Sequence, residues 1–131
     1  MSLLIPNNGE GDALQYFVNK AAPENLVLRL FSNNITPAET DTAATYTELA
    51  VSGYAAITLT GANWNAPSEG APSSITYAQQ TFTFTAAGST YGYFMTRATS
   101  GRIALAERDG AGVFTFSSGD SYKVTPQITA D

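Results

Sequence analysis

The sequence predicts an all-β protein, an antiparallel β-sandwich of eight to nine short strands with one short helix near the N-terminus. Two observations predict this fold. Short segments in which polar and apolar residues alternate recur along most of the chain, and turn-forming residues separate them every eight to twelve positions. This spacing is typical of jelly-roll-like or immunoglobulin-like sandwiches, and it leaves the order of the strands open.

The strongest pattern runs from Thr81 to Met95. Phe82 and Phe84 alternate with threonines, a small turn follows, and the segment Tyr91–Met95 is apolar on both faces. The first part predicts a half-buried strand, and the second predicts a strand that is covered on both sides. We therefore expect a hairpin at the centre of the fold.

A second stretch of the chain nearly repeats this pattern. Phe114–Ser117 leads through Gly119 to Tyr122, much as Phe82–Thr85 leads through Gly88 to Tyr91. We expect a second, related hairpin in the same core. One echo is too few to indicate a repeat array, which needs three or more copies.

Length and composition restrict the functions that the chain can have. Its 131 residues suffice for one domain with a core of its own. The chain has no cysteine and no histidine, so it lacks disulfides, thiolate nucleophiles, imidazole bases and the commonest transition-metal ligands. With 11 acidic and 6 basic residues the net charge is -5, which argues against a nucleic-acid partner.

The sequence offers no sign of a membrane protein or of a cofactor site. No apolar stretch approaches the roughly 20 residues that a membrane-spanning helix needs. The first residues form too short an apolar run for a signal peptide, and no basic residues precede it. We expect a soluble chain that is made in the cytosol and binds no cofactor.

Residues 1–9 are predicted to form an N-terminal arm, and residues 10–131 a single sandwich domain. Leu3, Leu4 and Ile5 are an apolar triplet before Pro6, and an Asn-Asn-Gly turn follows. Two interpretations stay open. The triplet can pair as an edge strand of its own domain, or it can dock on a neighbouring protein.

The one convincing helix is predicted between Asp12 and Pro23. Asp12 can cap a helix together with Gln15, three residues later. An apolar stripe with helical spacing follows, made of Leu14, Phe17, Val18 and Ala21. Such a stripe is usually core, so we expect it to lie against the sheets.

A strand is predicted at 26–31, and a polar loop follows at 35–44. Glu39 and Asp41 lie in this loop, where they are candidates for contact with a partner. The spacing of a calcium-binding EF-hand is missing, so we predict no metal site.

Further strands are predicted at 45–49 and 54–60, before the only tryptophan, Trp64. Trp64 precedes a loop rich in proline, serine and glycine. A single tryptophan is most often part of the core, and the alternative is an exposed anchor for a partner.

The alternation of apolar residues shifts by one position between Ala78 and Gln80, which predicts a bulge or bend there. The last strands are predicted at 103–106, 113–116 and 122–128. Pro126 indicates that the final strand is an edge strand or ends there.

No residues show the spacing of a catalytic site, so we predict that the protein is not an enzyme. A glycosidase pair is the one reaction type that the remaining carboxylates could serve, but their spacing does not indicate it. We expect a surface ion cluster or a subunit contact from the late charged residues Arg97, Arg102, Arg108, Glu107 and Asp109.

Several of these segments resemble small virion structural proteins of tailed bacteriophages. The resemblance is carried by Pro23–Pro37, by Gly53–Gly61, by Phe82–Phe84 with Tyr91–Tyr93, and by Phe114–Pro126. It spans most of the chain, and its motifs are structural ones. No catalytic residues carry over.

The resemblance implies a structural protein of the virion, assembled in the host cytoplasm. We expect a capsid decoration or cement protein that binds the major capsid protein lattice and stabilises the head, as a homo-oligomer and most simply a trimer. The alternative is a tail- or fibre-associated module that binds host-surface carbohydrate, with Trp64, Tyr46 or Tyr54 as stacking platforms. The partner-binding candidates are Leu3, Leu4, Ile5, Glu39, Asp41 and Trp64.

Overall fold

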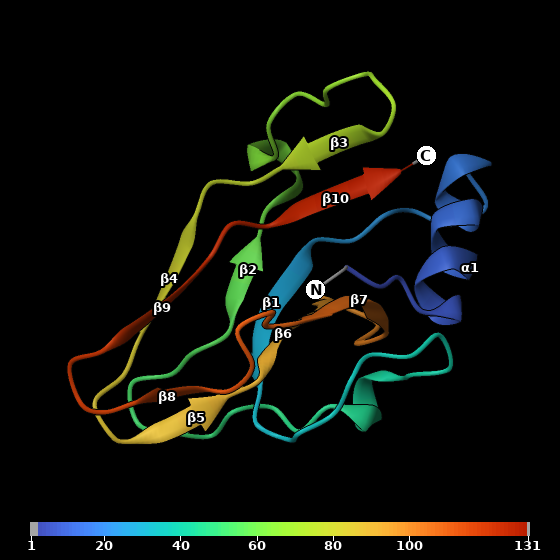
Figure 1. The fold of residues 1–131 in the computed structure, drawn as a ribbon. Helices are drawn as coiled ribbons and strands as arrows, with labels where there is room; N and C mark the ends of the chain where they lie inside the picture. The colour runs from blue at the N-terminus through green and yellow to red at the C-terminus, as the bar shows by residue number, and fades with distance from the viewer. Residues whose placement is uncertain (1–2, 131) are drawn as a thin grey trace.

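The computed structural model describes residues 3–130, and in this part of the chain it contains ten β-strands and one α-helix. The strands are paired antiparallel (Figure 1). The prediction of a mostly β, antiparallel fold is therefore confirmed. The elements are α1 (Asn7–Phe17), β1 (Leu26–Phe31), β2 (Ile57–Leu59), β3 (Ser73–Thr76), β4 (Gln80–Thr83), β5 (Gly88–Thr90), β6 (Gly92–Arg97), β7 (Ile103–Arg108), β8 (Phe114–Phe116), β9 (Ser121–Val124) and β10 (Gln127–Ala130).

A four-stranded sheet in the order β2-β1-β6-β7 forms the middle of the molecule. The prediction of a strand at 26–31 is confirmed. Strand β6 is buried along its whole length and pairs on both sides, as its apolar character on both faces predicts.

The predicted pairing within the central hairpin is wrong. Strand β4 does not pair with β6. It pairs with β9, and β5 pairs with β8. The two echoing segments therefore pair with each other rather than forming two separate hairpins: Phe82 faces Tyr122, and Thr90 faces Phe114.

The predicted bulge near Ala78 is confirmed. Thr76 pairs with Gln127, and Gln80 pairs with Val124, so three residues on one strand stand opposite two on the other. The extra residue shifts the side chains of the first strand to the opposite face, which explains the change in the apolar pattern.

The segment that contains β3 to β6 lies antiparallel to the segment that contains β7 to β10. Each strand pairs with its counterpart, β6 with β7, β5 with β8, β4 with β9 and β3 with β10. Residues 73–130 thus form one long, interrupted hairpin. Its tip, β6-β7, belongs to the four-stranded sheet, and Figure 1 shows the remaining ribbon curving around that sheet.

The main core lies between the sheet and this ribbon. Leu28, Leu30 and Met95 from the sheet are fully buried, and they share a cluster with aromatic and aliphatic residues of the ribbon. The rings of Phe84 and Phe116 stack with their centroids 3.7 Å apart. Burial of this apolar surface is the main force that holds the sheet and the ribbon together.

The other face of the sheet is covered by the loop after β1. Phe31, Tyr46 and Phe94 form a second cluster there, in which the Tyr46 and Phe94 rings stack at 5.0 Å. The strand predicted at 45–49 is wrong, because this loop contains a 3₁₀ turn at Ala43–Thr45 and only an isolated bridge between Phe31 and Glu48. The strand predicted at 54–60 is shorter than expected and is limited to β2.

The helix differs most from its prediction. It begins after Pro6, so the expected turn at 7–9 is helical, and it ends at Phe17 rather than near Pro23. Asp12 is not its cap. Asp12 lies inside the helix and is buried. Pro6 is the N-cap residue: its backbone is extended (φ -63°, ψ 162°), and its carbonyl accepts a 3.0 Å hydrogen bond from the Glu10 N–H.

Candidate functional site

The predicted apolar stripe of α1 points away from the sheets. Leu14 is 69% exposed, Phe17 is 90% exposed and Val18, next to the helix end, is 68% exposed. The expectation that the stripe packs on the sheets is therefore wrong. We call Leu14, Phe17 and Val18 the exposed stripe.

A buried ion pair explains this orientation of the helix. Asp12 accepts contacts of 2.9 Å from both Arg97 and Arg102, and Arg97 also donates a 2.7 Å hydrogen bond to the Tyr16 hydroxyl. Gly9 packs against the backbone of Ala104. A buried charge needs a partner, so the position of the arginines decides which face of α1 turns inward.

The inner side of α1 borders an apolar groove of about 320 Å³. We call it the groove. Trp64, Ile75 and Ile128 form its far wall, and all three remain partly exposed. The helix contributes Gly9, Ala13 and Tyr16, and the remaining lining comes from Ile5, Pro23, Glu24, Leu26, Arg97, Ala104 and Leu105.

The groove brings together two of the predicted partner-binding residues, Ile5 and Trp64. The Trp64 ring packs edge-on against Tyr77 with centroids 5.2 Å apart, so the indole is half-buried. Tyr46 is buried, and the Tyr54 hydroxyl is held by hydrogen bonds with the Leu30 N–H and with Glu48. None of these three rings is a freely exposed stacking surface.

The apolar triplet at the N-terminus lies on its own domain. Leu4 exchanges two backbone hydrogen bonds of 2.9 Å with Ala106 of β7. Leu3 and Ile5 pack against the main core. This is the edge-strand arrangement, and binding of a partner by these residues stays a prediction.

Glu39 and Asp41 lie apart from the groove lining, in the loop that covers the second face of the sheet. The Glu39 side chain is exposed, and its carbonyl accepts a hydrogen bond from the Asn7 N–H at the start of α1. Asp41 accepts hydrogen bonds from the Tyr46 hydroxyl and from the Ala38 N–H. Asp41 therefore has a structural role in the loop.

The predicted ion cluster of late residues does not form. Arg97 and Arg102 pair with Asp12, and Arg108 donates to the Ile35 carbonyl and lies over the Tyr91 ring. Within residues 3–130, no ion pair joins these arginines to Glu107 or Asp109.

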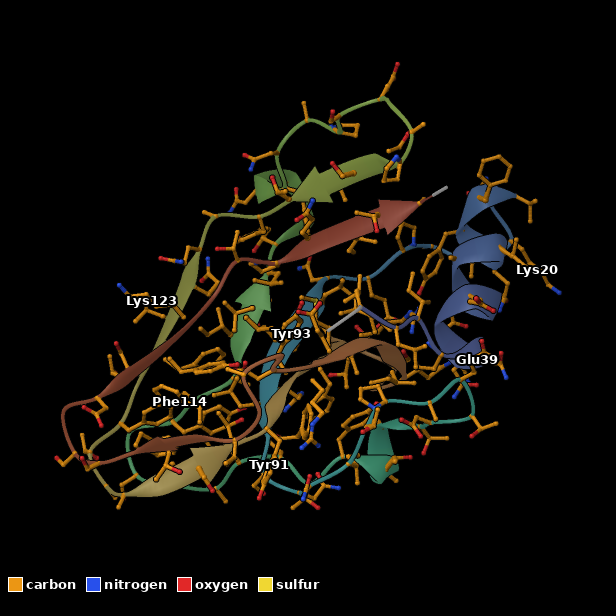
Figure 2. The ribbon with its side chains drawn as sticks, in the orientation of Figure 1. Lys20, Glu39, Tyr91, Tyr93, Phe114 and Lys123 are labelled. Atoms are coloured by element: carbon orange, nitrogen blue, oxygen red, sulfur yellow. The ribbon has the colours of Figure 1, made fainter. Side chains whose placement is uncertain are left out.

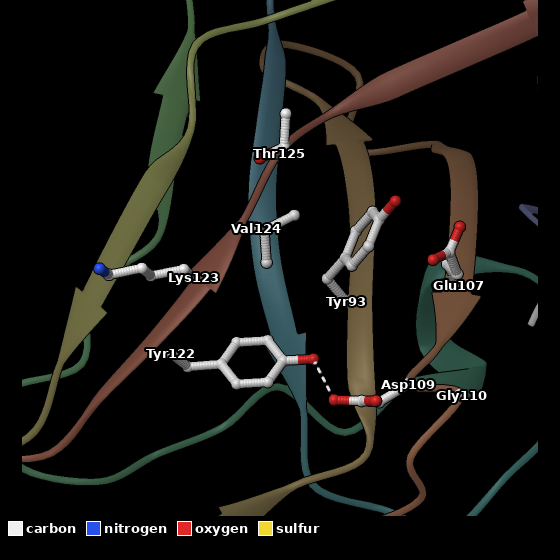
Figure 3. Close-up of a pocket in the computed structure, with 8 residues that line it drawn as sticks. All are labelled: Tyr93, Glu107, Asp109, Gly110, Tyr122, Lys123, Val124 and Thr125. Carbon is white, nitrogen blue, oxygen red and sulfur yellow. Dashed lines mark hydrogen bonds between the residues drawn. The ribbon is translucent and has the colours of Figure 1, made fainter.

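Glu107 and Asp109 instead line a polar cavity of about 260 Å³ together with Tyr93, Tyr122 and Lys123 (Figure 3). The Tyr122 hydroxyl donates a 2.8 Å hydrogen bond to Asp109. Burial raises the pKa of Glu107, and burial likewise raises the pKa of Tyr93 and of Tyr122. The cavity can exchange hydrogen bonds with a small polar ligand.

The described residues contain neither a recognisable metal centre nor a membrane-spanning helix. In residues 3–130, no group of three or more acidic side chains is placed to hold a metal ion. The helix of the same part of the chain is neither long nor apolar enough to cross a membrane.

Sequence reasoning identified the exposed stripe but gave it the wrong role. The 3- and 4-residue spacing shows that Leu14, Phe17 and Val18 share a face, but it cannot show which face is buried. An acid at position 12 and small residues at 9 and 13 mark the opposite face, and these were the available signals. The polar cavity was missed because Tyr93, Asp109 and Lys123 come from separate segments that meet only in the folded protein.

No family model, no curated protein and no solved structure matches the chain.

Proposed function

We propose that this protein is a non-enzymatic structural protein of a phage particle, a head decoration or cement protein that binds the major capsid protein lattice. The proposal rests on the exposed stripe of α1. Monomeric soluble proteins rarely expose several large apolar side chains together, and such patches are typical of protein-binding surfaces. The resemblance to virion structural proteins supports the capsid lattice as the partner and the virion as the location.

The finer description of the fold belongs to the same proposal. We interpret the four-stranded sheet and the ribbon as the two layers of a β-sandwich, because one cluster of buried residues joins them. A long hairpin folded across itself is consistent with a jelly-roll-like arrangement.

The direct test is to locate the protein in purified particles by cryo-electron microscopy. A density on the head that fits this fold supports the proposal. Absence of the protein from virions, together with abundance in infected cells, would contradict it. A tail location would favour the alternative function.

A binding experiment tests the exposed stripe itself. Purified protein is added to particles that lack it, and occupancy is measured by sedimentation of the particles. We expect Phe17→Ser to lose most of its occupancy, because the polar side chain removes the largest apolar contact. The matched control is Val113→Ser, which changes a 50% exposed apolar residue outside the helix and is expected to bind normally.

The second candidate function is a tail or fibre module that binds carbohydrate, and the polar cavity is the observation that favours it. Two tyrosines, two carboxylates and a lysine around about 260 Å³ offer the hydrogen bonds that a sugar needs. Glycan-array binding that is lost in Lys123→Ala and kept in Trp64→Ala, with both variants folded by circular dichroism, would support this function. Absence of binding to any glycan would remove it.

A further inference from the structure

The helix α1 separates two apolar features that nothing in the described chain covers. The exposed stripe lies on its outer side, and the groove lies on its inner side. One is convex and presents a 90% exposed phenylalanine, and the other is concave with half-exposed Trp64, Ile75 and Ile128. The two features are complementary in shape and chemistry, but they cannot meet within one chain.

The groove is large enough for the side chains of the stripe. Its volume of about 320 Å³ is many times the roughly 10 to 15 Å³ that one water molecule needs on the same measure. This space accommodates a phenylalanine ring together with part of a neighbouring aliphatic side chain. An aromatic anchor in an apolar pocket is the arrangement that contributes most to protein interfaces.

The buried area favours a head-to-tail contact over a symmetric helix pair. The stripe exposes on the order of 400 Å² of apolar surface, about half of the roughly 800 Å² that each partner buries in a standard interface. A symmetric pair of α1 helices would bury only the stripes and leave both grooves open. In a head-to-tail ring, each subunit buries its stripe on one side and its groove on the other.

The charged residues next to the stripe and in the groove are also complementary. Lys20 lies three residues after the end of α1, and its side chain points away from the sheets (Figure 2). Glu24 lines the groove and is partly exposed, and hydrogen bonds from the Ser100 and Thr99 N–H groups lower the pKa of its carboxyl. A stripe that enters the groove of a second copy brings a positive charge towards a negative one.

We propose that the exposed stripe of one subunit docks in the groove of a second copy of this chain, so that repeated head-to-tail contacts close a ring. The inference rests on the proposed role of the stripe as a protein-binding surface and names its immediate partner. Heterologous contacts of this kind give rings when the rotation between subunits closes. A ring brings several copies of the protein to the lattice at once, and binding through several copies strengthens weak contacts.

The first experiment measures self-association of the full chain by sedimentation equilibrium, without particles. The wild-type protein should form a concentration-dependent oligomer. Phe17→Asp places a charge in the apolar groove and should lower the association constant by at least about tenfold. Val113→Asp is the control and should associate normally. A wild-type monomer at all concentrations, or equal association of both variants, would overturn the inference.

The second experiment uses engineered disulfides, which the chain allows because it has no cysteine of its own. Val18→Cys, which keeps the Phe17 anchor, is mixed with Ile128→Cys or Ile75→Cys and oxidised. Mixed disulfide dimers should form, because docking of the stripe brings position 18 close to the groove, and a disulfide forms only when the two Cα atoms come within about 4.4 to 6.8 Å. A mixture of Val18→Cys with Val113→Cys should not cross-link. Absence of mixed dimers, or preferential bonding of Val18→Cys with itself as in a symmetric helix pair, would overturn the head-to-tail contact.

These results separate the inference from the proposed function. If the wild-type protein is a monomer in solution and only Phe17→Ser fails to bind particles, the stripe contacts the capsid directly. The inference then falls and the proposed function stands. If rings form but the protein is absent from virions, the proposed function falls and the ring remains.

Discussion

Oδ2 of Asp12 lies 2.9 Å from Nη1 of Arg97, and both side chains are more than nine-tenths buried. This ion pair connects α1 to the last residue of β6. It holds the inner face of the helix against the sheet, and it therefore keeps the exposed stripe on the outside.

Asp12→Ala is expected to lower the free energy of unfolding by about 3 to 5 kcal/mol, because it leaves the buried Arg97 without its carboxylate. Thermal and urea unfolding measure the loss. The control is Arg102→Ala, which removes the second partner of Asp12. Its side chain is 48% exposed, so we expect a loss of at most about 1 kcal/mol. Equal losses of unfolding free energy in the two variants would show that the buried Asp12–Arg97 pair contributes no more to stability than the exposed Asp12–Arg102 pair.

Two glycines in α1 provide a matched pair of substitutions. A side chain at Gly9 would overlap the Ala104 carbonyl oxygen, whereas a side chain at Gly11 would meet nothing within 4 Å. Gly11→Ala should stabilise the protein by up to about 1 kcal/mol, since alanine restricts the unfolded chain and favours a helix. Gly9→Ala should destabilise it. Urea unfolding of both variants tests the close packing of α1 on β7, and two stabilising substitutions would contradict it.

Glu107 and Glu24 should affect the pH dependence of stability in opposite directions. Burial raises the pKa of Glu107 above its usual 4.5, so the folded state holds this proton more tightly than the unfolded state. Its contribution to stability is complete below the unfolded pKa and is lost as the pH rises through the folded pKa. Glu107→Gln should therefore gain stability relative to wild type between acidic and neutral pH.

For Glu24, the pKa shift and its effect on the pH dependence of stability have the opposite direction. Hydrogen bonds from the backbone of Ser100 and Thr99 lower its pKa, so its contribution is present above the usual 4.5 and is lost as the pH falls through the folded pKa. Glu24→Gln should lose stability relative to wild type over the same rise in pH. Unfolding curves of both variants from acidic to neutral pH test the pair. Parallel curves would show that the two carboxyls have similar surroundings.

The alternation of apolar and polar residues predicted the features that depend only on neighbouring residues in the sequence. The strand at 26–31, the fully covered strand β6 and the bulge near Ala78 all follow from which residues are apolar at spacing 2. The pairing of β4 with β9 does not, because Phe82 and Tyr122 are brought together by a return path that the alternation cannot specify.

The candidate site was less predictable for a related reason. The orientation of α1 depends on Asp12 meeting arginines on the far side of the fold, which is a tertiary contact. Without it, the rule that an apolar stripe is buried gives the wrong face. The groove likewise combines Ile5, Trp64 and Ile128, three residues from separate parts of the chain.

The long hairpin of residues 73–130 also sets an order in which the fold can form. The turn between Arg97 and Arg102 brings β6 and β7 together, and each later pair lies just outside the previous one. Each step therefore closes only a short additional loop, which reduces the entropic cost that usually slows β proteins. Gly101 lies in the turn between β6 and β7 and has a φ of 70°, so substitutions there should slow refolding. Phe82→Ala in the ribbon should instead mainly speed unfolding. Stopped-flow kinetics would show the reverse distribution if the outer strands pair first.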